Sequence, residues 1–150
     1  MTIFEDLRES HEIQRALART MTHGRASAEN RRAAFLALAR ELDAHATAEE
    51  RHLYVPLLMD DAGLYVSRHA LADHHKAEKL VDQLRGVDPA TDEFEDLAKQ
   101  LSTEVRDHLD EEEHGTFQLA GKLLSKTRQR ELAADYRAEY AKRGGGNLAT

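Results

Sequence analysis

Two histidine–glutamate pairs in the sequence share the same spacing, with the carboxylate four residues after the imidazole. His45 precedes Glu49 in one segment, and His108 precedes Glu112 in another. On an α-helix, residues four apart lie one above the other on the same face. Each pair would therefore present an imidazole and a carboxylate together, and both groups are common metal ligands. The spacing predicts metal-binding chemistry at both pairs.

Both pairs lie on the apolar face of their segment when residues are placed at about 100° per residue around a helix. The face that holds His45 and Glu49 also carries Phe35, Leu38, Leu42 and Leu53. The face that holds His108 and Glu112 also carries Phe94, Leu97, Leu101, Val105 and Leu119. A carboxylate buried without a partner costs several kcal/mol or is forced to bind a proton. Two such carboxylates are difficult to explain as ordinary core packing.

Two further histidines face the apolar side of two other segments. His11 shares a helical face with Phe4, Leu7 and Ala18. His74 shares one with Ala70, Ala77 and Val81. A single histidine on an apolar face is more often a hydrogen-bonded core residue than a ligand. Four inward imidazoles and two inward carboxylates together favour a bound cation, because a cation would offset the burial of all six side chains at once.

The rest of the pattern predicts an all-α fold whose helices position these side chains. Apolar residues recur at helical spacing in four segments, approximately residues 3–21, 31–58, 65–84 and 94–124. No segment shows the alternation of a strand, and the short connections favour an up-down-up-down antiparallel four-helix bundle. Thr91 is predicted to cap the last helix, and Gly63 to end the second. Pro56 predicts a kink or an irregular turn shortly before that end.

A short peripheral helix is expected after the bundle. Residues 126–143 are highly charged, but apolar and aromatic side chains recur there at four-residue intervals, at Leu132, Tyr136 and Tyr140. The glycine-rich residues 144–150 are expected to form a loose, flexible tail. We therefore predict a four-helix bundle over residues 1–124 and a C-terminal helix with its tail over residues 125–150.

The composition limits the classes of partner. The chain has 150 residues, which suits one domain, and a formal net charge of −7. Nucleic acids and anionic membranes require a basic surface, so neither is expected as the main partner. No stretch approaches a membrane span of about 18 apolar residues, and the first residues lack the apolar run of an export signal. The absence of cysteine fits a reducing cytoplasm. We expect a cytoplasmic monomer or weak homodimer.

The motifs resemble those of the hemerythrin-like family, whose members contain the HHE cation-binding domain. In sequence order the matching residues are His11, His45-Ala-Thr-Ala-Glu49, Asp73-His74-His75-Lys76 and His108-Leu-Asp-Glu-Glu112. The resemblance covers roughly residues 3–120. It implies a centre of two iron ions bridged by Glu49, Glu112 and an oxygen from solvent. It also implies that His11 and His45 bind one iron, and that His74 and His108 bind the other.

The sequence departs from the hemerythrin pattern at two places. In hemerythrin the fourth helix carries a histidine and an aspartate five residues apart, whereas the inward pair here is His108 and Glu112. The residue at the fifth position, Glu113, points toward the edge of the apolar face. Hemerythrin also has two histidines four apart in its third helix, and here Glu78 stands four residues after His74. One iron is therefore expected to lack a nitrogen ligand.

Water, Glu78 or a tyrosine could take the place of the missing imidazole. Tyr54 is the candidate tyrosine, because it follows Glu49 in the irregular stretch before Pro56. On an ideal helix Tyr54 would point away from the site, so its binding to iron requires a bulge that redirects it. His52 is a candidate donor to a ligand carboxylate. The other histidines are expected at the surface or in loops, namely His23, His69, His75 and His114.

An oxygen donor in place of an imidazole stabilises Fe(III), which disfavours reversible oxygen carriage. The sequence therefore favours a centre that binds or reacts with nitric oxide, peroxide or dioxygen, through nitric oxide consumption or catalase-like peroxide breakdown. Two other classes remain open. One is an iron or oxygen sensor whose metal loading orders the bundle for a partner protein. The other is a metal-free helical interaction module in which the buried histidines and glutamates pair with each other.

Overall fold

The computed structural model describes residues 1–146 and residue 148, and every regular element within them is helical. In chain order the elements are α1 (Ile3–Thr22), α2 (Ala28–Glu49), η1 (Glu50–Tyr54), α3 (Val55–Leu58), α4 (Asp61–Arg85), α5 (Asp92–Glu111), η2 (Glu112–Thr116), α6 (Phe117–Leu123) and α7 (Lys126–Lys142). The two η elements are single π-helical turns between α-helical pieces. The prediction of an all-α chain is therefore confirmed.

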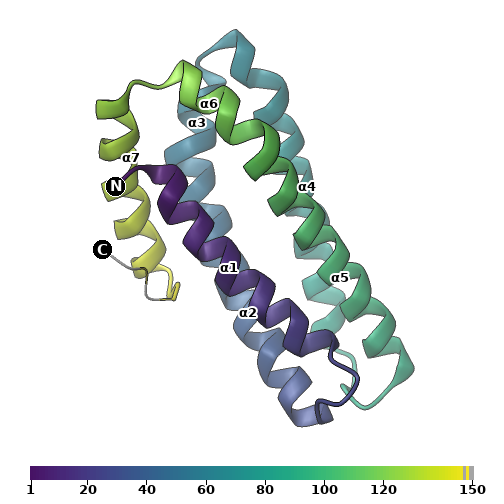
Figure 1. Cartoon of the computed structure of the whole chain (residues 1–150). Coiled ribbons are helices and arrows are strands. Elements are labelled where there is room, and N and C mark those ends of the chain that lie inside the picture. The colour runs from purple at the N-terminus through teal and green to yellow at the C-terminus, as the bar shows by residue number, and fades with distance from the viewer. Residues whose placement is uncertain (147, 149–150) are drawn as a thin grey trace.

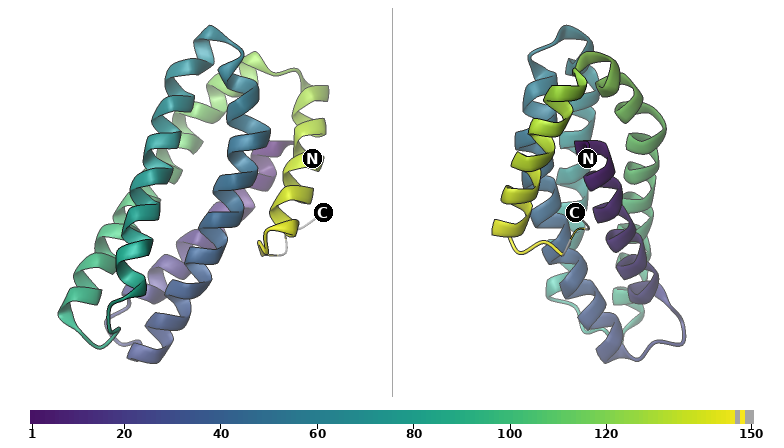
Figure 2. Two further views of the ribbon diagram at one scale, coloured as in Figure 1. Left: turned by 180° about the vertical axis from the view of Figure 1, so that it is seen from behind. Right: turned by 60° about the vertical axis from the view of Figure 1, so that its left-hand side comes forward.

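The long helices α1, α2, α4 and α5 run side by side with alternating direction (Figure 1). α1 packs against both α2 and α5, and α4 packs against α5. This is the predicted up-down-up-down bundle. α7 runs along the outside of the bundle beside α1 and α2, as both views in Figure 2 show. Within the described residues, no helix is long and apolar enough to span a membrane.

Side-chain caps determine where the helices begin. The Ser27 hydroxyl accepts a hydrogen bond from the backbone N–H of Asn30 at 3.1 Å. The hydroxyl of Thr91, the predicted cap, accepts one from the N–H of Phe94 at 3.3 Å. These bonds satisfy N–H groups that have no partner within the helix. As a result α2 and α5 begin a few residues earlier than the apolar spacing alone predicts.

The prediction that Gly63 ends the second helix is wrong. Gly63 lies in the first turn of α4, which begins at Asp61 because the Asp60 carboxylate accepts a hydrogen bond from the N–H of Ala62 at 2.9 Å. A Cβ atom at position 63 would lie 2.2 Å from the carbonyl oxygen of Leu57. Glycine is therefore needed for the close approach of α4 to the end of α3, and not for a helix terminus.

The two π-turns interrupt the second and the last long helix next to a histidine–glutamate pair. In η1 the carbonyl of Glu50 accepts a hydrogen bond from the N–H of Val55. In η2 the carbonyl of Glu112 accepts one from the N–H of Phe117. Each bond spans five residues instead of four, so each turn is wider than an α-helical turn. The irregularity predicted before Pro56 is η1, whereas η2 has no proline near it and was not predicted.

Two apolar clusters fill the bundle on either side of its polar middle. One cluster connects α1, the end of α2 and α7, and includes Ile3, Leu7, Leu53 and Tyr136. The other connects the opposite halves of the long helices, and includes Met21, Leu38, Leu84 and Phe94. The inward histidines and glutamates lie between these clusters. The apolar side chains on both sides therefore restrict the access of water to them.

α7 contributes to the first apolar cluster through Tyr136 and Tyr140, which are buried at the interval that the sequence predicts. The N–H of Gly146 donates a hydrogen bond to the Glu41 carboxylate at 3.1 Å, which attaches the start of the tail to α2. The tail prediction also covers residues that lie outside the described ones, namely Asn147, Ala149 and Thr150. The division into a bundle over residues 1–124 and a C-terminal segment over 125–150 stays a prediction.

Candidate metal centre

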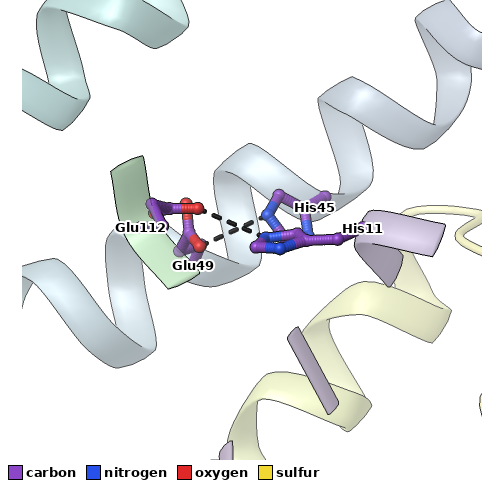
Figure 3. Close-up of side chains that lie close together, drawn as sticks. All are labelled: His11, His45, Glu49 and Glu112. Carbon is purple, nitrogen blue, oxygen red and sulfur yellow. Dashed lines mark ion pairs between the residues drawn. The ribbon is translucent and has the colours of Figure 1, made fainter. Parts of the chain in front are cut away.

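Six side chains of the types that bind metal converge in the middle of the bundle. They are His11 of α1, His45 and Glu49 of α2, His74 of α4, His108 of α5 and Glu112 of η2. The side chains of Glu49 and Glu112 are 0% and 1% exposed. Figure 3 shows the imidazoles of His11 and His45 directed at these two carboxylates. The structure thus brings together the side chains that the apolar faces place inward.

Four of these residues form a first group on the α1 side of the centre: His11, His45, Glu49 and Glu112. The Nε2 atom of His11 lies 3.2 Å from Oε1 of Glu112. The Nε2 atom of His45 lies 3.3 Å from Oε2 of Glu49. One donor atom from each residue lies within 4.8 Å of the others. Because a metal–ligand bond is about 2.0–2.2 Å long for these donors, one ion fits among them.

A second group on the α4 side uses the same two carboxylates with His74 and His108. The Nε2 atom of His74 lies 3.1 Å from Oε1 of Glu49, and that of His108 lies 3.5 Å from Oε1 of Glu112. The two Nε2 atoms are 3.1 Å apart, so both imidazoles direct this nitrogen at the same point. Glu49 and Glu112 therefore belong to both groups and lie where they would bridge two ions.

The outer nitrogen of each imidazole has a partner of its own. The Nδ1 partners are Glu113 for His11 at 2.6 Å, Tyr136 for His45 at 3.0 Å, Glu50 for His74 at 3.0 Å and Asp73 for His108 at 3.1 Å. A neutral imidazole that donates its Nδ1–H to such an oxygen directs the lone pair of Nε2 at the centre. Outer partners of this kind hold ligand rings in place and increase their basicity.

Several buried atoms at the centre have no hydrogen-bond partner within the described residues. They are Nε2 of His11, Nε2 of His45, both carboxylate oxygens of Glu49 and Oε1 of Glu112. Buried polar atoms are almost always satisfied, since an unsatisfied one costs about 1–3 kcal/mol. A pair of cations would satisfy all of them together. The donor set and its unsatisfied atoms therefore fit a two-metal centre.

Protons stabilise the same carboxylates when metal is absent. Burial alone would lower the pKa of His11, but the neighbouring carboxylates of Glu112 and Glu113 raise it to about 9. Burial also opposes protonation of His74, but the neighbouring carboxylates of Glu49 and Glu50 raise its pKa to about 10. At neutral pH these imidazoles are therefore protonated in the metal-free chain. Metal and protons compete for the same nitrogen atoms.

Tyr54 lies inside the site. It is the last residue of the π-turn η1, and this is the kind of irregularity that a role as an iron ligand requires. The side chain is fully buried, and its hydroxyl donates a hydrogen bond to the carboxylate of Glu112. Its ring is 6.2 Å from the ring of His74, centroid to centroid. Burial and the charge of Glu112 raise the pKa of Tyr54, so the phenol keeps its proton when metal is absent. The alternative ligand Glu78 is exposed and lies outside both groups.

Glu113 has a role that the sequence did not reveal. It lies outside both metal-binding groups, as expected, but its carboxylate contacts His11 and forms two bonds with the guanidinium of Arg15, at 3.0 and 3.1 Å. Although burial acts in the opposite direction, these two partners lower the pKa of Glu113 to about 2. The wide turn of η2 allows two consecutive glutamates to reach the centre, with Glu112 inside and Glu113 behind His11.

The remaining histidines lie away from the two groups. His52 is half-buried, and the Nδ1 partners of the four site histidines are other residues. The expected surface histidines are all exposed, namely His23, His69, His75 and His114. Sequence reasoning also missed Glu50, Asp73 and Tyr136 as outer partners. Asp73 directly precedes His74 in the sequence, yet its carboxylate hydrogen-bonds to His108 on the neighbouring helix. This contact depends on how the two helices pack, so the sequence of one helix does not reveal it.

Comparison with known proteins agrees with this geometry. The sequence model of the hemerythrin HHE cation-binding domain matches residues 2–120. The chain belongs to the hemerythrin HHE cation-binding domain family. Among solved structures, it is similar to a hemerythrin HHE cation-binding domain-containing protein from Mycobacterium kansasii, with a TM-score of 0.82 and 25% sequence identity. This likeness covers 95% of this chain and 87% of the other. The family resemblance predicted from the motifs is confirmed.

A curated relative is a protein named DNA nickase from Nostoc sp. (strain PCC 7120 / SAG 25.82 / UTEX 2576). The two sequences are 29% identical over 103 residues, which are 69% of this chain. The match covers only 29% of the relative, so this chain corresponds to less than a third of that protein. The name is that of the longer protein.

Proposed function

We propose that the hemerythrin HHE domain of this chain holds two iron ions, and that the centre binds or reacts with nitric oxide, peroxide or dioxygen. The observation that supports the proposal is the sharing of Glu49 and Glu112 by two groups of metal-binding side chains. Two imidazoles would serve each ion, with His11 and His45 on one side and the remaining pair on the other. Carboxylates shared between facing helices are the usual way in which helical bundles hold two iron ions.

The protein residues prepare the site for reaction rather than for reversible oxygen carriage. When bound, the two ions would supply a redox centre and a Lewis acid. Glu49 and Glu112 would offset part of their charge, and the outer partners would fix the imidazole rings. Tyr54 would add an oxygen donor where hemerythrin has an imidazole, and oxygen donors favour Fe(III). The apolar clusters on both sides would limit the entry of bulk water.

A cavity of about 770 Å³ gives small molecules access to the centre. Its lining comes from α1, α2, α4 and α5, and it reaches His45, His74 and His108. Part of the wall is apolar, with Ala39, Leu42, Val81 and Val105. Such a wall suits a small uncharged molecule such as nitric oxide, dioxygen or hydrogen peroxide. Peroxide breakdown needs no further reactant, because two molecules of hydrogen peroxide give two of water and one of dioxygen.

Stopped-flow mixing of iron-loaded protein with nitric oxide, and separately with hydrogen peroxide, tests the reactivity. We expect a rapid change of the visible spectrum with at least one of these molecules, and dioxygen release if peroxide is broken down. The metal-free protein is the control and should give neither signal. An iron-loaded protein that contains two ions but remains spectroscopically unchanged with nitric oxide, peroxide and dioxygen would rule out the proposed reactivity.

Tyr54→Phe tests whether the phenol oxygen binds iron. We expect the iron-loaded wild type to show a phenolate-to-Fe(III) charge-transfer band in the visible, and the variant to lack it. The buried ring keeps its shape in phenylalanine, so folding should be little affected. Tyr65→Phe is the matched control, since Tyr65 is an exposed tyrosine at the surface of α4. If the wild type has no such band, or the variant retains it, Tyr54 is not a ligand.

A metal-responsive sensor is the second candidate, and one contact favours it. Tyr136 of the outer helix α7 hydrogen-bonds to Nδ1 of His45, so metal loading and the packing of α7 are physically connected. A sensor would show metal-dependent protection of α7 from hydrogen exchange together with no turnover of peroxide.

A cytoplasmic location and a monomeric or weakly dimeric state complete the proposal. The absence of cysteine is consistent with a cytoplasmic location.

A further inference from the structure

A third cluster of metal-binding side chains lies outside the centre, on the surface between α4 and α5. It consists of His69 and Asp73, which are one turn apart on α4, and Glu111 at the end of α5. The Nε2 atom of His69 lies 2.9 Å from Oε2 of Glu111 and 3.5 Å from Oδ2 of Asp73. One donor atom from each residue lies within 4.8 Å of the others. One imidazole and two carboxylates suit a divalent first-row ion such as Fe(II).

A cavity of about 250 Å³ connects this cluster with the centre. His69 and Glu111 line it, and their side chains are 46% and 58% exposed, so this end meets solvent. Tyr54 and Glu112 also line it, and both are buried, so the other end reaches the bridging carboxylate. The Oε1 atom of Glu112 has no hydrogen-bond partner within the described residues. A cation that enters at the surface end therefore meets, at the buried end, a carboxylate with one oxygen that accepts no hydrogen bond from the described residues.

Asp73 connects the cluster directly to a ligand of the centre. Its Oδ2 atom lies 3.5 Å from Nε2 of His69 and 3.1 Å from Nδ1 of His108. The same carboxylate oxygen thus contacts the outer cluster on one side and a site histidine on the other. Because the side chain is 8% exposed, its charge is only weakly screened by water. A negative charge at this position would strengthen the attraction of a divalent ion to the cluster.

We propose that His69, Asp73 and Glu111 form an auxiliary divalent-cation site through which Fe(II) enters the two-metal centre. The ion is held at the surface by two or three protein ligands and by water, so it binds weakly and exchanges. It then passes along the cavity beside Tyr54 to Glu112. No oxidation step is part of this transfer, since the ion remains divalent. The inference rests on the proposed two-metal centre as the destination of the ion.

The larger cavity offers a competing route, because it also reaches the centre. Arg40 and Arg85 line this cavity, but carboxylates outnumber them, namely Asp43, Glu50, Asp73, Glu78, Asp82 and Glu104. The charge of this wall therefore does not keep a divalent cation out. The smaller cavity has no lysine or arginine among the described residues that line it, and its buried end is the bridging carboxylate Glu112. We therefore infer that cations enter past His69, and variants on the two walls distinguish the routes.

Loading with Co(II) tests the proposal without redox chemistry. Metal-free protein is mixed with Co(II) in a stopped-flow instrument, and the visible absorption of the bound ion is followed. We expect His69→Ala and Glu111→Gln to slow loading about tenfold or more, as expected when local attraction of an ion is lost, while the centre still fills with two ions. Equilibrium dialysis should show a weak third equivalent in the wild type, and this equivalent should be missing in both variants.

Matched controls are His75→Ala, an exposed histidine of the same helix, and Glu78→Gln on the larger cavity. Both should load at the wild-type rate and keep the third equivalent. The proposal is wrong if His69→Ala loads as fast as wild type, or if Glu78→Gln slows loading and His69→Ala does not. A wild type that fails to bind two ions tightly would instead contradict the two-metal centre. The weak site at His69 is still measured by dialysis in that case.

Discussion

A Glu112→Ala variant is expected to purify with almost no bound metal, whereas the wild type carries about two ions. Glu112 belongs to both groups of ligands, so its loss removes a donor from each ion at once. It also leaves the negative charge of Glu49 to hold two cations alone. Metal content is measured by atomic emission on freshly purified protein, together with the thermal midpoint of unfolding.

The loss of metal should lower the thermal midpoint of Glu112→Ala by about 10 °C relative to the as-purified wild type. An ion present at about 1,000 times its dissociation constant stabilises by about 4 kcal/mol, and 1 kcal/mol corresponds to about 2–4 °C in a domain of this size. The metal-free forms of the two proteins should differ much less. Glu112→Gln keeps the shape and should behave similarly, and Asp107→Ala, at an exposed position of α5, should retain both ions. Full metal content in Glu112→Ala would contradict the bridging role.

Metal affinity is expected to fall steeply between pH 8 and pH 6. Burial lowers the pKa values of His11 and His74, but the neighbouring carboxylates outweigh it and raise them to about 9 and 10, so both imidazoles carry protons throughout this range. A metal ion must displace both protons, and each displaced proton weakens the apparent affinity about tenfold per pH unit. The combined affinity should therefore fall about 100-fold per pH unit. Calorimetric titration with Co(II) in buffers of different ionisation enthalpy should show at least two protons released per chain. Release of none would contradict the assignment.

The stability of the metal-free protein should change with pH in the opposite direction. Because the folded-state pKa values of His11 and His74 lie above the ordinary value of 6.5, their protonated forms stabilise the folded chain. This contribution is fully present below pH 6.5 and is lost as the pH rises through about 9 and 10. The difference in thermal midpoint between metal-loaded and metal-free protein should therefore be larger at pH 9 than at pH 6.

The helical pattern predicted the bundle and the inward position of the six donors, because both depend only on the period of an α-helix. The positions of the π-turns depend on more than that period. Pro56 signalled the first turn and made the redirection of Tyr54 a testable hypothesis. The sequence of η2 contains no proline, and its one glycine, Gly115, is a much weaker signal of an irregular turn than Pro56. The consequence, that Glu112 and Glu113 both reach His11, was therefore not predicted.

The outer partners could not be found from single helices. Asp73 hydrogen-bonds to His108 from the neighbouring helix, and Tyr136 hydrogen-bonds to His45 from α7, which follows the bundle in the sequence. Such contacts depend on how the helices are rotated and shifted relative to one another. The auxiliary cluster was missed for the same reason, because His69 has the exposure of an ordinary surface histidine. Its position beside Glu111 appears only once α4 and α5 are packed together.

Anomalous diffraction at the iron absorption edge, from crystals of protein loaded with iron, decides whether the bundle holds two ions. We predict two peaks about 3.5–4 Å apart, a separation typical of two-metal sites, with Glu49 and Glu112 between them. His11 and His45 should lie on one peak, and His74 and His108 on the other. A single peak, or density away from these six side chains in fully loaded crystals, would contradict a carboxylate-bridged pair of ions.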